Sequence, residues 1–430
     1  MKLNYKRTIL IGLAFMSISA FWQMYDYVVP LILSNSFELD ETITGAIMAA
    51  DNLLALFLLP IFGSLSDKVK SPLGKRMPFI LIGTTLAVIL LMILPYADNT
   101  RNLPLFIIGL FFVLICMGTY RSPAVALMPD LTPKNLRSRA NAIINLMGAV
   151  GGGYALLMIG QVVEDVELPN TPNYYPLAIS IVLFMVICVA ILFFTIKENK
   201  LHVELKDILA EEPEQKENTD SKKGAKLPKD VMRSLIFLLA SVAFWFIAYN
   251  AVTTAFSRYA MKVWDLTNKQ AASCLTIAMV AAIISYIPIG SIAAKIGRKK
   301  TILIGIVLLG SCFFAAGLFD THNNIMFVFF CIIGFAWAAI GVNSYPMVVE
   351  MASAGDVGKY TGLYYTFSMT AQVITPILSG WLLENIGYRT LFPYSVVFCI
   401  LAIITMSQVK HGDSKPAKKA SALENLDIDD

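Results

Sequence analysis

Long apolar segments recur along the whole chain, and short polar connections separate them. Each is close to the 20 or so mostly apolar residues that an α-helix needs to cross a bilayer, about twice the length of a barrel strand. Because hydrocarbon offers no hydrogen-bond partners, helices are expected. The pattern predicts twelve spans: Thr8–Leu33, Glu41–Phe62, Pro78–Tyr96, Leu103–Leu127, Ala140–Val163, Tyr175–Ile196, Met232–Phe256, Gln270–Ala293, Thr301–Leu318, Ile325–Val349, Tyr360–Leu383 and Leu391–Val409.

The longest polar stretch follows the sixth segment; it is rich in Lys and Glu and lacks aromatic residues. Such a composition cannot bury enough apolar surface to fold alone. We therefore expect a six-helix bundle over residues 1–196, a cytoplasmic linker over 197–231, a second six-helix bundle over 232–409 and a cytoplasmic tail over 410–430. A short surface helix from Leu201 to Leu209 is an alternative within the linker.

Composition and charge agree with a membrane protein. Hydrophobic residues make up 57% of the 430 residues and charged residues only 15%, whereas a soluble domain is about a quarter charged. If the N-terminus is inside, 28 of the 34 Lys and Arg residues lie in inner segments and 5 in outer ones. The positive-inside rule then places both termini in the cytoplasm. The net charge of +4 thus reflects topology and does not indicate nucleic-acid binding.

Several kinds of chemistry lack their residues. All six cysteines lie in apolar runs without a CxxC pair, and the three histidines fall in loops or the tail. No GxxxxGK[ST], HExxH or GxSxG pattern occurs, which argues against an ATP-driven pump and against a membrane-embedded enzyme. We expect neither a metal site nor another cofactor.

The two halves repeat a short turn of glycine and basic residues. GSLSDKVKSPLGKR, residues 63–76, follows the second segment, and GSIAAKIGRK, residues 290–299, follows the eighth. Two copies at matching positions indicate an internal repeat. Parallel repeats with a solute site near the midplane are a known transporter design.

The first copy resembles the signature of the major facilitator superfamily, Gly-x-x-x-Asp-Arg/Lys-x-Gly-Arg/Lys-Arg/Lys, with extra residues from Val69 to Leu73. The string SDKVKSPLGKRMPFILIG is similar to the stretched form in glycoside–pentoside–hexuronide cation symporters and sucrose/proton symporters, including the animal solute-carrier branch near them. SPAVALMPDL from Ser122 and RSRAN from Arg137 resemble the same group around helices four and five. The resemblance implies an all-α membrane protein of the major facilitator fold, with two pseudo-symmetric six-helix bundles.

The chain also departs from these relatives. Val125 stands where plant-type sucrose symporters carry an arginine, although Arg121 lies one turn earlier on the same face. Ala294 stands where the signature has its acidic residue in the second copy, so the first half is expected to carry most of the gating latch.

Three charged residues lie within predicted spans: Asp26, Asp51 and Arg121. A charge there costs about 2.5–3.5 kcal/mol on insertion scales, so it usually faces water or a partner and is functional. Asp26 and Asp51 are the candidates for proton coupling, and a structural ion pair of Asp51 with Arg121 is the alternative. Arg121 is expected to pair with Asp51, to bind substrate hydroxyls or a carboxylate, or to extend to the inner headgroups.

On the first helix Ser19, Trp22, Gln23 and Asp26 form one stripe, because their offsets are +3, +4 and +7. Tryptophan and amide side chains suit a sugar, so we expect the stripe to line a cavity; an interfacial aromatic belt is the alternative. Further polar and aromatic residues occur at similar depth, where packing between helices explains them almost as well. The candidate substrate-binding residues are Trp22, Gln23, Asp26, Asn52, Arg121, Asn145, Trp245, Tyr249, Asn250, Asn343, Tyr365 and Gln372.

The resemblance further implies a cytoplasmic latch in which acidic side chains meet basic ones in one conformational state. Ordinary positive-inside topology is the alternative for the basic residues. The candidate gating residues are Asp67, Lys68, Gly74, Lys75, Arg76, Asp130, Arg137, Arg139, Arg298 and Glu350.

Together these features predict a secondary transporter that carries a small solute, a sugar or glycoside, by proton-coupled symport with alternating access. Na⁺ is an alternative coupling ion. A proton-coupled exporter of amphipathic compounds is the nearest rival function, and a non-transporting membrane receptor is a distant one. We expect a monomer in the plasma membrane, with a small-molecule substrate, the proton and the bilayer as its partners.

Overall fold

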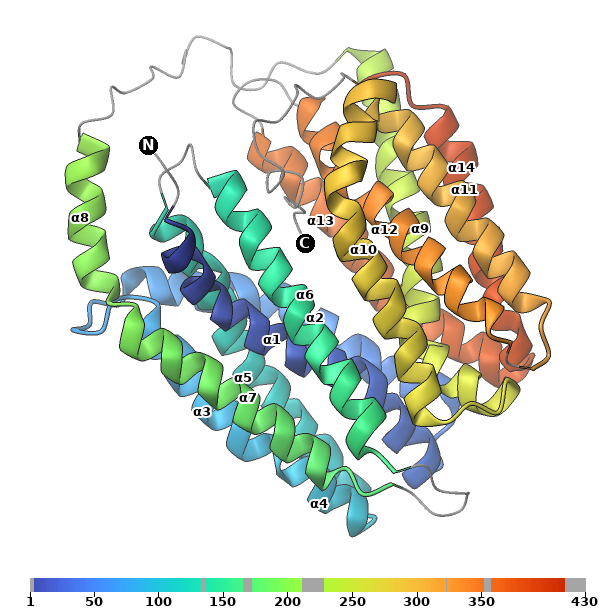
Figure 1. Ribbon diagram of the computed structural model, residues 1–430, viewed down its shortest axis with the longest axis horizontal. Coiled ribbons are helices and arrows are strands. Elements are labelled where there is room, and N and C mark those ends of the chain that lie inside the picture. The colour runs from blue at the N-terminus through green and yellow to red at the C-terminus, as the bar shows by residue number, and fades with distance from the viewer. Residues whose placement is uncertain are drawn as a thin grey trace. The chain divides into compact units, whose positions relative to one another are not determined.

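The computed structural model describes residues 4–132, 137–164, 172–210, 228–321, 323–351 and 357–413. These ranges are almost entirely helical and contain no strand. The chain divides into two compact units (Figure 1). The first comprises Met1–Pro213 and Leu266–Thr276, and the second Glu214–Asp265 and Ile277–Asp430.

The first unit, blue to green in Figure 1 except for the yellow Leu266–Thr276, is built on α1, which packs mainly against α6 and α7. In the same unit α5 packs against both α2 and α3. The elements are α1 (Tyr5–Leu31), the π-helix η1 (Ile32–Ser36), α2 (Glu41–Lys68), α3 (Met77–Leu91), α4 (Ile93–Asn99), α5 (Leu103–Asp130), α6 (Arg137–Val162), α7 (Tyr175–Thr195) and α8 (Glu198–Ala210).

The second unit repeats these pairings. Here α9 packs against α13 and α14, as α1 packs against α6 and α7 in the first unit. Likewise α11 packs against α12, as α3 packs against α5. The elements are α9 (Lys229–Val263), α10 (Asn268–Ile296), α11 (Arg298–Gly317), α12 (Ile325–Glu350), α13 (Val357–Asn385), the 3-10 helix η3 (Tyr388–Thr390) and α14 (Leu391–Ser407).

Among the described residues, eleven helices are long and apolar enough to cross a membrane. Of the twelve predicted spans, the one in α13 is not among them, although α13 has 29 residues. Its sequence contains many hydroxyl and amide side chains, which lower its hydropathy. The prediction of an all-α, multi-pass membrane fold is confirmed.

The predicted third span is not one continuous helix. It is interrupted at Met92, between α3 and α4. Pro95 explains the break, because proline has no N–H for the carbonyl of Leu91 four residues earlier and its ring crowds that carbonyl.

A close crossing between α1 and α6 fixes the centre of the first unit. A Cβ atom added to Gly151 would overlap the backbone carbonyl of Met16. On the same two helices, a Cβ at Gly148 would approach Phe15 and Ser19 to 3.0 Å or less. Only glycine lets the two backbones approach this far, so the crossing fixes the register of α1, which carries Trp22 and Asp26.

Candidate functional site

The polar stripe on α1 is the least buried face of its central section. Between Ser17 and Leu31, four side chains are half-buried and all the others are buried. The four are the residues of the predicted stripe, Ser19, Trp22, Gln23 and Asp26. The helical period therefore turns these residues away from the packed interior of the first unit, where Phe21 and Tyr25 are each 1% exposed.

The three charged residues within the spans belong to one electrostatic group. The charge of Asp26 on α1 interacts with those of Asp51 on α2 and Arg121 on α5. Each of the three side chains is half-buried. Asp51 also accepts a hydrogen bond of 2.9 Å from the Asn52 amide. Three helices thus bring two carboxylates and one guanidinium together, a combination that sequence spacing alone does not establish.

Arg121 and Trp22 are in direct contact. The guanidinium carbon lies 5.7 Å from the centroid of the Trp22 ring, within the range of a cation–π interaction. Tyr25 meets the same indole edge to face, with ring centroids 5.4 Å apart. The Trp22 Nε1 and the Tyr25 hydroxyl are both buried and have no hydrogen-bond partner within the described part of the chain. Because buried polar atoms are rarely left unpaired, the Nε1 of the half-buried Trp22 is a natural contact for a bound solute, whereas the Tyr25 hydroxyl lies in the packed interior.

Tyr120, next to Arg121 in the chain, anchors α5 to α1. Its side chain is fully buried, and its hydroxyl donates to the Ala14 carbonyl at 2.9 Å and contacts the Ser17 hydroxyl. This contact fixes the height of α5 against α1 and so helps to place Arg121 against Trp22.

In the second unit, two aromatic rings stack between α9 and α12. The Tyr249 ring on α9 stacks on Trp337 of α12, with centroids 3.7 Å apart and planes 8° from parallel. Both are half-buried, and the neighbouring Asn250 has a buried Nδ2 with no hydrogen-bond partner among the residues that the structure describes. Sequence reasoning missed Trp337 because it lies inside an apolar run with no polar residue beside it.

The other candidates of the second unit differ in exposure. Trp245 is 0% exposed and Asn343 is 2% exposed, with its amide bonded to the Ala339 carbonyl at 2.9 Å. We leave these two out of the solute-facing set, because a buried side chain presents no surface to a solute. Three remaining candidates are half-buried: Tyr365 and Gln372 on α13 and, in the first unit, Asn145 on α6.

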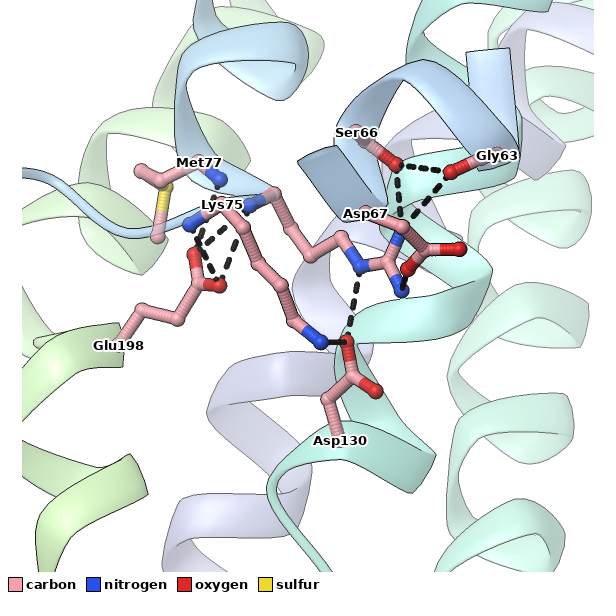
Figure 2. A network of polar contacts seen from close by, with 8 residues as sticks. Gly63, Ser66, Asp67, Lys75, Met77, Asp130 and Glu198 are labelled. Atoms are coloured by element: carbon pink, nitrogen blue, oxygen red, sulfur yellow. Dashed lines mark hydrogen bonds and ion pairs between the residues drawn. The ribbon is translucent and has the colours of Figure 1, made fainter. Parts of the chain in front are cut away.

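The predicted latch of the first half forms a connected network around Arg76 (Figure 2). Its Nη2 lies 2.5 Å from Asp67 Oδ1, and its Nε donates to Asp130 Oδ2 at 2.8 Å. Its Nη1 donates to the Gly63 carbonyl at 3.3 Å and to the Ser66 hydroxyl. The Nζ of Lys75 lies 3.1 Å from the same Asp130 oxygen.

Asp130 is the electrostatic centre of this network. Burial would raise the pKa of its carboxyl, but hydrogen bonds and charge from Arg76 and Lys75 outweigh burial and hold the pKa below its ordinary value. The Arg76 side chain is 6% exposed, whereas Asp67 is 58% exposed. The Arg76–Asp130 pair is therefore the more protected link between α3 and α5.

A residue that sequence reasoning placed in the linker completes the network. Glu198, in the first turn of α8, is 1% exposed, and its carboxylate accepts four hydrogen bonds from three backbone amides (Figure 2). Oε1 accepts from Lys75 at 2.9 Å and from Arg76 at 3.1 Å, and Oε2 accepts from Arg76 and from Met77 at 3.0 Å each. These amides form the start of α3, where a helix has unpaired donors and favours negative charge.

The second half has a smaller polar network at the corresponding turn. Arg298 Nη1 lies 2.5 Å from Glu350 Oε2, which joins the start of α11 to the end of α12. Asp413, after α14, accepts from the Lys299 amide at 2.8 Å. Lys68 is exposed at the end of α2. The side chains of Arg137 and Arg139 lie outside the described part of the structure.

Comparison with known proteins shows the family and the fold. A model of the family described as MFS/sugar transport protein matches residues 9–410, nearly the whole chain. The chain belongs to the MFS/sugar transport protein family.

Solved structures share the fold: a bacterial homolog of the human lysosomal transporter Spinster has a TM-score of 0.68 at 15% identity, covering 95% of this chain and 97% of that one. A bacterial homologue of the iron transporter ferroportin has a TM-score of 0.67 at 13% identity, covering 95% and 99%.

Curated relatives of this MFS/sugar transport family chain match over shorter segments. A protein of Staphylococcus haemolyticus named as a proline/betaine transporter is 30% identical over 161 residues, 37% of this chain and 33% of its own length. A sucrose transport protein of Arabidopsis thaliana is 29% identical over 144 residues, 29% of this chain and 23% of its own. The chain thus spans a third or less of these two relatives.

Proposed function

We propose that this protein is a secondary transporter that moves a small polar solute, a sugar or glycoside, by proton-coupled symport with alternating access. The observation that carries the proposal is the charge interaction of Asp26 with Asp51 and Arg121, which lie on three helices long and apolar enough to cross a membrane. Charges within membrane spans are costly unless water, a solute or an ion reaches them. Family membership supports transport as the use of this group.

The chemistry of the α1 stripe supports a hydroxylated solute. Trp22 offers an apolar ring face, and Gln23 offers an amide that both donates and accepts hydrogen bonds. Trp22 Nε1, which has no hydrogen-bond partner among the described residues, supplies a further donor. The half-buried Tyr249–Trp337 stack offers a comparable aromatic surface in the second unit.

We assign proton coupling to Asp26 and Asp51. Two ionised carboxylates within electrostatic reach repel each other, and Arg121 compensates only one negative charge. Binding of one proton makes the group neutral overall, and loss of the proton restores one net negative charge. A group that alternates between these charge states can couple solute movement to a proton gradient.

A zwitterionic solute such as proline or betaine is a second candidate. The staphylococcal relative named for these compounds matches 37% of this chain. The Arg121 guanidinium suits a carboxylate, and Asp26 with the Trp22 ring suits an ammonium group. The same cluster is thus chemically able to hold either solute class.

A flux panel in proteoliposomes tests the proposal and separates the candidates. Purified protein is assayed with labelled glycosides, disaccharides, proline and betaine, each with a pH gradient, a Na⁺ gradient or neither. We expect uphill uptake of a glycoside or disaccharide that needs the pH gradient and is abolished by a protonophore. Uptake of proline or betaine without uptake of any sugar selects the second candidate. Uptake that needs the Na⁺ gradient identifies Na⁺, and not the proton, as the coupling ion. Binding of hydrophobic cations without glycoside uptake selects the exporter, and binding without any flux selects a receptor.

A further inference from the structure

Glu198 and Asp67 act on the same residue from opposite sides. Glu198 holds the backbone amide of Arg76, whereas Asp67 and Asp130 hold its guanidinium. Arg76 is therefore fixed at both ends, and the position of its side chain depends on where Glu198 places its backbone (Figure 2).

The first turn of α8 also binds the loop between α2 and α3. Asn199 Nδ2 donates to the carbonyls of Ser71 and Pro72, each at 2.9 Å. Gly74, between these contacts and Arg76, has a φ of +109°. The start of α8 thus binds the loop between α2 and α3 along most of its length.

The second unit contains the same device in reduced form. Asp413 follows the sixth helix of its half, as Glu198 follows the sixth helix of the first half, and it caps the start of α11 through the Lys299 amide. A glycine with positive φ precedes the capped amides in both copies, Gly74 at +109° and Gly297 at +95°. Recurrence at matching positions of the repeat argues that the cap belongs to the latch and is not an accident of the linker.

We propose that Glu198 is a positioning residue of the cytoplasmic latch, which sets where Lys75 and Arg76 meet Asp67 and Asp130. The inference rests on the proposed transport function, because a latch has a role only in a protein that alternates between states. With this role for Glu198, the first turn of α8 belongs to the gating machinery, although the sequence of that turn is typical of a linker.

The first test measures the contact itself. In Glu198→Gln the amide NH₂ faces backbone donors, so only one oxygen remains to accept. We expect amide hydrogen exchange in residues 71–77 to accelerate by about tenfold to a hundredfold, as loss of a charge-assisted cap implies. Glu204→Gln, an exposed change of the same charge on the same helix, is the control and leaves this exchange unchanged. Equal exchange in the two variants would overturn the proposal.

The second test measures gating without a substrate. Single reporter cysteines on the two sides of the membrane, in a cysteine-free background, report the conformational balance through their labelling rates. If Glu198 acts through Arg76, Glu198→Gln shifts the balance in the direction of Asp67→Asn, and the double variant shifts it less than the sum of the two. Two results would overturn the proposal and leave Glu198 as a structural cap only. One is additive effects in the double variant; the other is faster amide exchange with an unchanged conformational balance.

A further variant keeps the test decisive if Glu198→Gln does not fold. Asn199→Ala removes two hydrogen bonds from the same loop without disturbing a buried charge, and we expect a smaller shift in the same direction. No shift in Asn199→Ala would then count against the proposal. Both readouts are independent of the solute, so a failed flux panel would not be mistaken for failure of this inference.

Discussion

Gly74 lies so close to the carboxylate of Glu198 that no side chain fits between them. A Cβ at residue 74 would overlap Glu198, and the φ of +109° disfavours any other residue. Gly74→Ala is therefore expected to destabilise the protein through backbone strain of about 1–2 kcal/mol and through displacement of Glu198. Gly387→Ala is the matched control, because Gly387 has a φ of +123° and nothing within 4 Å of the added Cβ. Equal falls in melting temperature for the two variants would contradict the contact.

Asp67→Asn removes the exposed partner of Arg76 and leaves Asp130 in place. We expect a shift in conformational balance with unchanged solute affinity, because Asp67 lies about 24 Å along α2 from Asp51 of the charged group, by helix rise. Reporter-cysteine labelling and equilibrium binding measure the two quantities. Lys70→Gln changes one exposed charge in the same loop and serves as control. An altered affinity without a shift would move Asp67 out of the latch.

Asp51→Asn fixes one carboxylate of the charged group in a neutral form. Proton-driven uphill uptake should fall to background, while solute counterflow, which needs no net proton movement, continues. Glu38→Gln, an exposed acidic residue outside the group, should leave both activities unchanged. Uphill uptake at the wild-type rate in Asp51→Asn would remove this residue from coupling.

The crossing of α1 and α6 should tolerate no side chain at Gly151. Gly151→Ala forces a methyl group against the Met16 carbonyl, and overpacking of this kind costs about 1–3 kcal/mol. We expect a lower melting temperature and weaker solute binding, because α1 carries the stripe. Gly160→Ala lies on the same helix, and its Cβ meets its nearest neighbour at an ordinary 3.6 Å. It should therefore be nearly neutral.

The depressed pKa of Asp130 predicts how the latch responds to acid. Its stabilising contribution is complete above the unfolded aspartate pKa of about 3.9 and is lost as the pH falls through the lower folded value. Thermal unfolding between about pH 3 and pH 7 should therefore show a steeper loss in wild type than in Asp130→Asn. Asp320→Asn breaks an exposed pair with Arg389 and should leave the slope unchanged.

The sequence predicted the features that depend on local periodicity. The stripe from Ser19 to Asp26 follows from helical spacing, and burial along α1 agrees with it. Pro95 was a local signal for the helix break at Met92, but a span prediction based on segment length and hydropathy ignores it. Relations between distant segments had no such signal. Glu198 looks like any linker glutamate until the chain folds back to place the start of α3 against it, and Trp337 looks like any apolar residue until Tyr249 stacks on it.

The hydrogen bonds of Glu198 and Asn199 with the loop after α2 also determine where a protease site or fusion partner can be inserted in this chain. The connection between the two bundles is not a passive tether throughout. Here that connection begins as a structural part of the first unit. A protease site inserted at Glu198 or Asn199 would therefore disturb the contacts that support Arg76.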